Sequence, residues 1–317
     1  MNKIRLAYFG TPDFSADLLE KLITDQSIKR LVEVKLVVTQ PDRKVGRKQI
    51  LTPSPAKVIA KKYNINVIDD LETGLSEKFN QIDLALLYAY GRIIPKGILS
   101  LPKMGFWNIH PSFLPKYRGP SPIAQSLING DTVTGVTLIK MDDQIDHGPI
   151  IAQEKLIILP TDKRPDLEKK LTDLAFKMFC NLIKGVDTCF EPIAWGPASW
   201  RGEAGEKHGI KPFIKQNHTQ ATYTKLLKKD DGFVSFENLK LKIKNSPKQL
   251  FNLFRGLYPW PGIWTLITPP GCNAAQQKRL KIINMQLISD KLIIKKVQLE
   301  GKKEVDFKTF NQAYRIF

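Results

Sequence analysis

Apolar segments alternate with amphipathic ones along the first 190 residues of the chain. Lys3–Phe9 is an apolar run that stops at Gly10, and Phe14–Ile23 then places apolar residues at helical spacing. Further strand-like segments lie at Val32–Thr39, Asn66–Ile68, Asp83–Tyr90, Met104–His110, Val133–Lys140 and Pro149–Ile157. Helical patterns lie between them at Ala56–Tyr63, Leu71–Phe79, Pro95–Leu99, Ser121–Asn129 and Arg164–Lys184. This alternation predicts the α/β class, with a Rossmann-like, parallel-rich sheet and helices on both of its faces.

The pattern changes after residue 190. Phe190–Lys215 has no clear periodicity and is rich in Gly and Pro, so we predict a first domain at 1–190, a linker at 191–215 and a second domain at 216–317. Short apolar segments follow at Phe233–Phe236, Gly262–Ile267, Lys281–Met285 and Leu292–Val297, with one helix at Pro247–Leu253. Short strands separated by turns predict a small, OB-like β-barrel.

The composition is that of an ordinary globular protein, with 42% hydrophobic and 25% charged residues in 317. There is no 18-residue apolar run and no leader-like segment at the start, so we expect a soluble, cytoplasmic protein. Cys180, Cys189 and Cys272 are widely spaced, which argues against a disulfide framework or a zinc site. The four histidines lack metal-ligand spacing, so no metal is expected.

Positive charge is concentrated in the last third of the chain. The net charge is +18, and Lys207–Phe317 carries 21 Lys and Arg against 7 Asp and Glu, a net charge of +14. A basic module of this kind indicates a polyanionic partner such as nucleic acid. The alternative is a lysine-rich but merely solvated surface.

A second basic segment follows the predicted strand Val32–Thr39. The loop from Gln40 to Pro55 carries four basic residues and one acid, and it is interrupted by Pro and Gly. Long loops at the carboxyl ends of strands are where α/β sheets place binding residues. Contact with phosphate or nucleic acid is the favoured interpretation, and a solvated surface loop is the alternative. Because no Gly-x-Gly-x-x-Gly follows the first strand, a dinucleotide site is not indicated.

Three polar residues in the stretch Gly105–Ile150 can carry chemistry. Asn108 and His110 lie two apart on a predicted strand, so their side chains leave the same face near its carboxyl end. Asp146 lies in a turn between two further strands and can reach the same place. An Asn, a His and an Asp together suit acyl transfer, with an amide donor for an oxyanion and a proton-relaying imidazole. The alternative is a His that only forms structural hydrogen bonds; His147 is predicted to be a surface residue.

These residues belong to a longer series of motifs. The series comprises Phe9–Phe14, Thr39–Arg43 with Gly46-Arg47, Ala89–Gly91, Asn108–Pro115, Arg118-Gly119, Gly135–Thr137, Met141-Asp142, Ile145–Gly148, Ala221–Lys225, Arg255, Tyr258–Trp264, Gly301–Lys303 and Arg315. In these motifs, which span nearly the whole chain, the sequence resembles the folate-dependent formyltransferases. The Thr-Gln-Pro-Asp-Arg and Pro-Trp-Pro segments resemble in particular the members that act on methionyl-tRNA.

The resemblance implies a set of roles. The catalytic set would be Asn108, His110 and Asp146. Residues implied to contact the co-substrate, 10-formyltetrahydrofolate, are Ser112, Phe113, Leu114, Pro115, Ala89 and Tyr90. Residues implied to contact initiator methionyl-tRNA are Phe14, Arg43, Arg47 and Lys48, while the basic second domain would hold the tRNA body. We expect a monomer that needs no metal.

The sequence departs from the family pattern at a few positions. Phe113 stands where Leu is usual, His147 where Thr is usual, and Ala194–Ile210 is longer than the usual linker. Two rival functions remain open at this point. A formyltransferase acting on a sugar nucleotide or small amine needs the same three catalytic residues but no basic second domain. A non-catalytic RNA-binding protein would have no need to keep those three residues.

Overall fold

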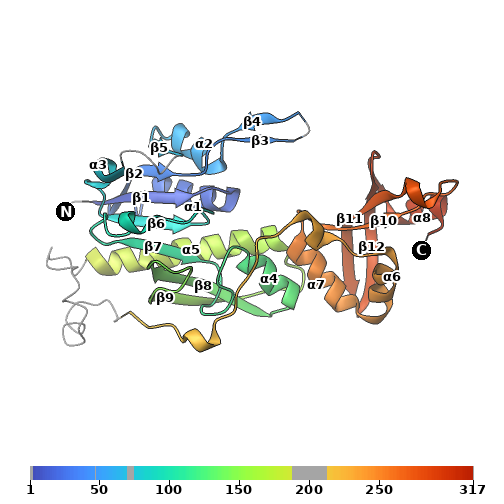
Figure 1. The fold of residues 1–317 in the computed structure, drawn as a ribbon. Coiled ribbons are helices and arrows are strands. Elements are labelled where there is room, and N and C mark those ends of the chain that lie inside the picture. Colours follow the sequence, from blue (N-terminus) through green and yellow to red (C-terminus); the bar gives the residue numbers. More distant parts are fainter. Residues whose placement is uncertain (1–2, 47, 70–74, 188–212, 317) are drawn as a thin grey trace. The chain divides into compact units, whose positions relative to one another are not determined.

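The computed structural model describes residues 3–46, 48–69, 75–187 and 213–316 (Figure 1). The chain forms two compact units. Unit 1 comprises Met1–Pro120, Thr134–Leu156 and Glu168–Tyr223, and unit 2 comprises Ser121–Val133, Ile157–Leu167 and Thr224–Phe317. The predicted linker at 191–215 lies mostly outside the described residues.

Among the described residues, seven strands form one sheet in the order β5–β2–β1–β6–β7–β8–β9 (Figure 1). They are β1 (Ile4–Gly10), β2 (Val32–Val38), β5 (Asn66–Ile68), β6 (Leu84–Tyr88), β7 (Phe106–His110), β8 (Val133–Lys140) and β9 (Ile150–Ile157). Strands β5, β2, β1, β6 and β7 run parallel, and β8 is antiparallel to β7. The predicted parallel-rich α/β fold is confirmed. Every residue of β6 and β7 is buried, which explains the continuous apolar run of β6 and means that the polar side chains of Asn108 and His110 in β7 are buried as well.

Helices accompany the sheet, and one of them begins with a recognisable capping signal. They are α1 (Asp13–Thr24), α2 (Pro55–Lys62), α3 (Leu75–Phe79), the 3₁₀ helix η1 (Lys96–Ile98) and α5 (Arg164–Asp187). Helix α2 is capped by the Ser54 hydroxyl, which accepts a hydrogen bond from the Lys57 backbone N–H, and Pro55 occupies its first turn. The segment predicted as a helix at Leu71–Phe79 is helical from Leu75, and residues 70–74 lie outside the described residues.

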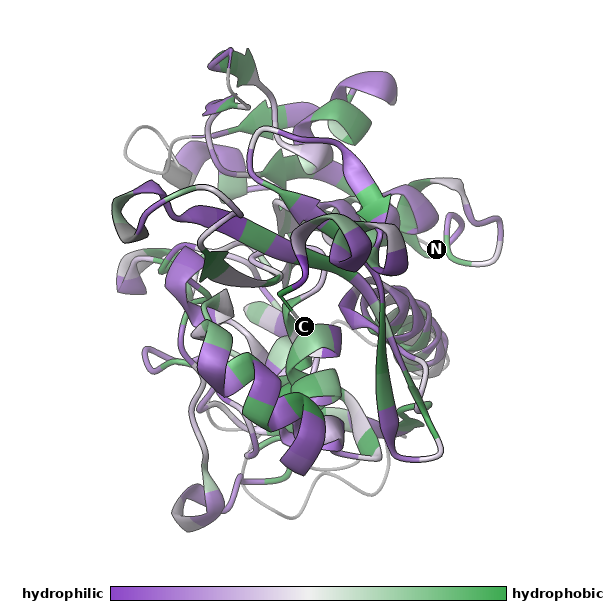
Figure 2. Cartoon of the chain, turned by 90° about the vertical axis from the view of Figure 1, so that its right-hand side faces the viewer, coloured by the Kyte–Doolittle hydropathy of each residue, from purple (hydrophilic) through white to green (hydrophobic). Residues whose placement is uncertain are grey.

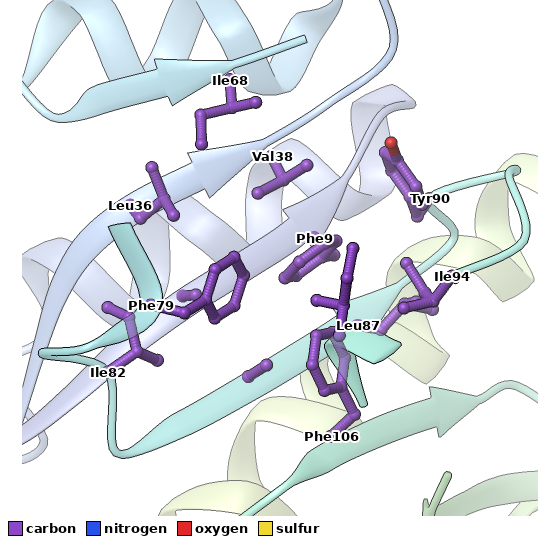
Figure 3. Close-up of a cluster of buried hydrophobic side chains, with 13 residues drawn as sticks. Phe9, Leu36, Val38, Ile68, Phe79, Ile82, Leu87, Tyr90, Ile94 and Phe106 are labelled. Atoms are coloured by element: carbon purple, nitrogen blue, oxygen red, sulfur yellow. The ribbon is translucent and has the colours of Figure 1, made fainter. Parts of the chain in front are cut away.

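An aromatic cluster forms the core on one face of the sheet (Figure 3). The Phe9 ring lies 5.5 Å from the Tyr90 ring in an edge-to-face arrangement and 5.1 Å from the Phe106 ring. Phe79 packs against both phenylalanines. Burial of each such side chain contributes roughly 1.5–3 kcal/mol, so this cluster fixes the carboxyl ends of β1 and β6 firmly.

A partly buried ion pair joins β1 to Asp83, the residue just before β6. Arg5 donates to the Asp83 carboxylate from its backbone N–H at 2.9 Å and from its guanidinium Nε and Nη2 atoms, each at 3.0 Å. Burial alone would raise the pKa of Asp83, but these hydrogen bonds, with a contribution from Lys103, outweigh it and lower that pKa.

The basic segment after β2 is more ordered than predicted. It forms a hairpin of two short antiparallel strands, β3 (Arg43–Val45) and β4 (Ile50–Thr52), that extends from the sheet (Figure 1). All six strand residues are exposed. The prediction of a plain loop was therefore wrong, because strands of three exposed residues leave no alternation of buried and exposed positions for a sequence pattern to show.

In the described part of unit 2, four antiparallel strands form a sheet in the order β10–β11–β12–β13. They are β10 (Ile263–Ile267), β11 (Lys278–Ile288), β12 (Lys291–Leu299) and β13 (Glu304–Asp306). Helices α4 (Pro122–Asn129), α6 (Phe236–Asn245), α7 (Pro247–Leu257) and α8 (Phe307–Tyr314) belong to the same unit. The sheet is consistent with the predicted small, barrel-like domain. In Figure 2 the helices carry hydrophobic and hydrophilic segments in turn, as amphipathic helices on a core do.

The strand predicted at Phe233–Phe236 is not formed. Phe233 makes one isolated bridge to Trp264, and Ser235 then caps α6 by accepting a hydrogen bond from the Asn238 N–H. The Ser cap ends the extended segment before a strand can develop.

Helices α4 and α7 pack closely at Gly256. A Cβ at this position would lie 2.6 Å from Ile128 Cγ1 and 2.7 Å from the Ala124 carbonyl oxygen. The preceding residue, Arg255, is buried and donates hydrogen bonds to the backbone carbonyls of Leu159 and Asp162. The absence of a side chain at Gly256 lets the two helix backbones approach.

Candidate active site

Strand β7 brings Asn108 and His110 to the same face of the sheet, as predicted. Asn108 pairs with Leu87 of β6 and with Ile139 of β8, and His110 pairs with Thr137 of β8. Both side chains are buried, so their polar atoms need partners within the protein.

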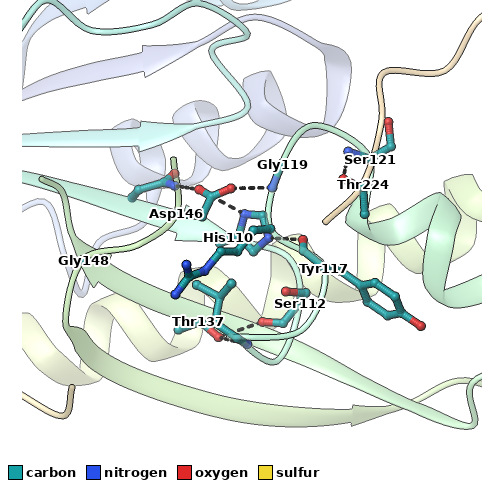
Figure 4. A network of polar contacts seen from close by, with 12 residues as sticks. His110, Ser112, Tyr117, Gly119, Ser121, Thr137, Asp146, Gly148 and Thr224 are labelled. Atoms are coloured by element: carbon teal, nitrogen blue, oxygen red, sulfur yellow. Dashed lines mark hydrogen bonds and ion pairs between the residues drawn. The ribbon is translucent and has the colours of Figure 1, made fainter. Parts of the chain in front are cut away.

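The carboxylate of Asp146 supplies the central partner (Figure 4). Its Oδ1 accepts a hydrogen bond from Asn108 Nδ2 at 2.9 Å, and its Oδ2 accepts one from the Gly119 backbone N–H at 2.7 Å. The same Oδ1 lies 3.4 Å from His110 Nδ1. The structure thus brings the three residues predicted from the sequence together around one carboxylate, whose side chain is only 10% exposed.

The hydrogen bond on the far side of the imidazole assigns its tautomer. His110 Nε2 lies 2.8 Å from the Tyr117 carbonyl oxygen, which can only accept, so Nε2 carries a hydrogen. Nδ1 is then the ring atom that can gain or lose a proton, and it faces Asp146.

Asn108 Nδ2 carries two hydrogens and uses one on Asp146, which leaves the other with no acceptor among the described residues. The arrangement provides an N–H donor beside a proton-exchanging group.

Asp146 occupies an unusual backbone conformation. It lies in the loop between β8 and β9 with φ +50°, in the left-handed region that residues with a side chain rarely adopt. Gly148 of the same loop passes so close to β8 that an added Cβ would lie 1.8 Å from the Lys140 carbonyl oxygen. The loop is therefore held tightly against the sheet.

The segment after β7 is fixed by the Thr137 hydroxyl (Figure 4). Thr137 Oγ1 donates to the Ser112 carbonyl at 2.7 Å and accepts from the Leu114 N–H at 3.1 Å. Gln153 Nε2 donates to the Leu114 carbonyl at 2.8 Å, and the Ser112 hydroxyl donates to the Lys116 carbonyl at 2.6 Å. The turn predicted to contact folate is thus ordered by hydrogen bonds within it and from Thr137 and Gln153, with Phe113 beneath the Lys155 ammonium.

The turn after β6 holds the other two residues predicted to contact folate. Ala89 has φ +54°, and the Tyr90 side chain points into the core next to Phe9. The Tyr90 carbonyl accepts from Thr11 Oγ1 at 2.9 Å and from Gln40 Nε2 at 2.8 Å. Only the backbone of Tyr90 therefore lies at the edge of the sheet.

The residues predicted to contact tRNA lie apart from this network. Phe14 lies in the first turn of α1 and packs edge-to-face on Tyr88 at 5.2 Å. Arg43 donates from Nη2 to Gln40 Oε1, which ties the base of the hairpin to the turn at Tyr90. Lys48 is exposed at the hairpin tip, and Arg47 lies outside the described residues.

Sequence reasoning missed a layer of residues behind Asp146. Gln216, 70 positions away, donates to the backbone carbonyl of Asp146, and Arg118 donates to Gln216. His147 is only partly exposed: it pairs with Asp142 at 2.7 Å and stacks on His218 with ring centroids 4.0 Å apart. The pKa of His218 is lowered mainly because its ring loses solvent, and to a smaller extent by the charges of His147 and Arg118. No sequence pattern links these positions, although Arg118 does belong to a family motif.

The described part of the chain holds few other candidate groups. Among residues 3–46, 48–69, 75–187 and 213–316, no three His, Cys, Asp or Glu side chains cluster as metal ligands. The described helices include none that is long and apolar enough to cross a membrane. Cys180 and Cys272 are free thiols, and burial raises the pKa of Cys180 to about 11.

Comparison with known proteins adds independent information. A family model described as Formyl transferase matches residues 2–183. A methionyl-tRNA formyltransferase of Caldicellulosiruptor saccharolyticus is 33% identical and covers 98% of this chain and 97% of its own length.

Two solved structures are similar over different extents. Phosphoribosylglycinamide formyltransferase from Bacillus halodurans is 25% identical with a TM-score of 0.50, and covers 61% of this chain and 100% of its own. An N-formyltransferase from Helicobacter canadensis, solved with folinic acid and dTDP-3-aminofucose, is 19% identical with a TM-score of 0.56 over 96% of this chain and 98% of its own. At that identity the second similarity concerns the fold alone.

Proposed function

The chain belongs to the formyl transferase family, and we propose that it transfers the formyl group of 10-formyltetrahydrofolate to the α-amino group of initiator methionyl-tRNA. The observation that carries the acceptor is sequence identity over the whole chain. The methionyl-tRNA enzyme is 33% identical over 98% of this chain, including the basic last third. The Helicobacter canadensis N-formyltransferase matches 96% of this chain at only 19% identity, and the phosphoribosylglycinamide enzyme matches only 61% of it. The additional unit is where a large polyanionic acceptor would be held.

The chemistry requires little activation of the nucleophile. A free α-amino group titrates near pH ~8, so a substantial fraction is unprotonated at neutral pH. The amine nitrogen forms a bond to the formyl carbon, the bond from that carbon to the folate nitrogen breaks, and a proton passes from the amine to the departing nitrogen. The demanding point is the negative charge that develops on the formyl oxygen during attack.

We assign the catalytic roles to the three residues around the Asp146 carboxylate. Asn108 would donate its second Nδ2 hydrogen to the formyl oxygen. His110 would exchange a proton at Nδ1, and Asp146 would hold both side chains in place. The hydrogen bonds of Asp146 to Asn108 and Gly119 support this assignment, because they set which atoms of Asn108 are left to face a substrate.

The contacts to the two substrates are also proposals. The family uses formyl-tetrahydrofolate, and we assign its binding to the Ser112–Pro115 turn and the turn at Ala89 and Tyr90. The hydrogen bonds that hold the backbone of both turns support this assignment, since the folate would meet turns that are already ordered. The residues assigned to tRNA are Phe14, Arg43, Arg47 and Lys48.

The arrangement of the whole chain completes the proposal. We propose a catalytic domain at 1–190, a linker at 191–215 and a tRNA-binding domain at 216–317. Because its acceptor takes part in translation, the enzyme would act in the cytoplasm, and we propose that it does so as a monomer.

One assay tests the function. Purified protein is incubated with 10-formyltetrahydrofolate and charged initiator tRNA, with charged elongator tRNA and an amino-sugar nucleotide as alternative acceptors. We expect formylation of the initiator, and a strong preference for the sugar nucleotide would refute the proposal. Asn108→Ala should lower kcat by about 10²–10³, the effect of losing one oxyanion donor. Asn129→Ala, an exposed amide at the end of α4, serves as the control.

A further inference from the structure

Gln216 is a buried residue that holds the backbone of the loop carrying Asp146. It is 5% exposed and lies just after Ile214, whose N–H and carbonyl both pair with Ile150 at the start of β9. Its Nε2 donates to the carbonyl oxygens of Asp146 and Gly148, each at 2.8 Å. One side chain therefore spans the turn on which Asp146 lies.

The orientation of the Gln216 amide is fixed by its partners. Its Oε1 accepts from Arg118 Nε at 3.2 Å and from Arg118 Nη2 at 2.7 Å. A guanidinium only donates and backbone carbonyls only accept, so the amide oxygen must face Arg118 and the amide nitrogen must face the loop. All four hydrogen bonds depend on this orientation, and no other uncharged side chain of this length provides both groups.

These contacts close a ring around Asp146. The carboxylate of Asp146 accepts from the Gly119 N–H, the preceding residue Arg118 binds Gln216, and Gln216 binds the Asp146 carbonyl. Asp146 is thus held at its side chain by Gly119 and at its backbone by Gln216, which the neighbouring Arg118 in turn binds. Its φ of +50° lies in the left-handed region, which Asp adopts more readily than most residues but less readily than Gly, so these hydrogen bonds favour a conformation that the loop alone would populate less.

We propose that Gln216 is a positioning residue for the reaction, which sets the backbone of Asp146 so that its carboxylate aligns Asn108 and His110. The inference rests on the proposed function, since it assigns Gln216 a role only through Asp146. Without the amide, the carbonyls of Asp146 and Gly148 lose their buried donor and the loop relaxes from the left-handed turn. The carboxylate then moves relative to Asn108.

The test compares two variants with a matched control. Gln216→Met keeps the side-chain volume but removes the side-chain hydrogen bonds, and Gln216→Ala removes the volume and the hydrogen bonds together. We expect kcat to fall about 10–100-fold, the scale of a misplaced catalytic group, while KM for both substrates changes less than about threefold. Gln125→Ala, which removes an amide hydrogen bond from the surface of α4, should leave kcat unchanged.

A double-mutant cycle separates positioning from general damage. In the Asp146→Asn background, replacing Gln216 should cost almost nothing further, because the residue it acts through is already disabled. Full additivity of the two losses, a wild-type kcat in Gln216→Met, or a loss that merely follows unfolding of both variants at the assay temperature would overturn the inference. If the wild-type protein itself fails to formylate methionyl-tRNA, the proposed function fails instead, so the two failures are distinguishable.

Discussion

Replacing Asp146 by Asn should disable the enzyme while leaving its fold intact. Both carboxylate oxygens accept from N–H groups, Oδ1 from Asn108 and Oδ2 from Gly119. An amide has one acceptor oxygen, and the Gly119 N–H cannot turn away, so the new oxygen must face Gly119. The new NH₂ group then faces the NH₂ group of Asn108, which has to rotate its amide to offer an oxygen. The N–H that would have met the formyl oxygen is turned away.

The size of the effect follows from two losses. Loss of one oxyanion donor costs about 10²–10³ in kcat. The variant also removes the charge 3.4 Å from His110 Nδ1, a change that costs about 10⁴ in a serine protease triad. Because the losses act on one unit they are not additive, and we expect kcat to fall about 10³–10⁴, or roughly 4–5.5 kcal/mol of transition-state stabilisation.

Single-turnover formylation of methionyl-tRNA at saturating folate donor measures this effect without interference from product release. The free energy of unfolding should change by no more than about 1–3 kcal/mol, since one hydrogen-bond partner is kept. Asp143→Asn is the matched control: it makes the same chemical change in the same loop, where Asp143 forms an exposed ion pair with Lys96. A rate within tenfold of wild type for Asp146→Asn would remove Asp146 from the mechanism.

Three further predictions concern stability and tRNA. Gly256→Ala should destabilise the protein by about 1–3 kcal/mol in thermal denaturation, because the added Cβ meets α4, whereas Gly185→Ala, with open space around it, should not. Asp83→Asn should lower the free energy of unfolding by about 1–2 kcal/mol at pH 7. The lowered pKa of Asp83 makes this stabilisation fully present above pH ~4 and lost as pH falls further, so the gap between variant and wild type should close in acid. Neutralising Lys44 and Lys48 should weaken tRNA binding and reduce its salt dependence without changing the KM for folate.

Each of these has a clear contrary result. Equal stability of the two glycine variants would mean that α4 and α7 adjust freely to an added methyl group. If the difference in free energy of unfolding between Asp83→Asn and wild type did not depend on pH, the Asp83 carboxylate would gain no stabilisation from its arginine partner. An unchanged salt slope in the lysine variants would exclude phosphate contact by the lysines of the hairpin, and a raised KM for folate would show that the hairpin acts on the donor site.

The sequence predicted the parts of the fold that bury long regular runs of side chains. Strand β6 is apolar throughout because both of its faces are covered, and the strand pattern of β7 located Asn108 and His110 at a strand end. The hairpin β3–β4 and the cap at Ser235 escaped prediction because exposed or very short elements leave no periodic signal. Gln216 was not predicted because its role depends on the chain coming back to the Asp146 loop 70 residues later, and no local sequence pattern encodes such a contact.

The left-handed turn at Asp146 also constrains how this site can change. Glycine is the residue that would relax that turn, and glycine has no carboxylate. A sequence with Gly at this position would relieve the backbone of the loop but would lack the carboxylate that the chemistry needs. A sequence that keeps the carboxylate must therefore retain a conformational penalty at this position. Choosing the most stabilising residue at each position separately would thus remove the carboxylate from the catalytic loop. Stabilising substitutions elsewhere in the fold carry no such conflict with activity.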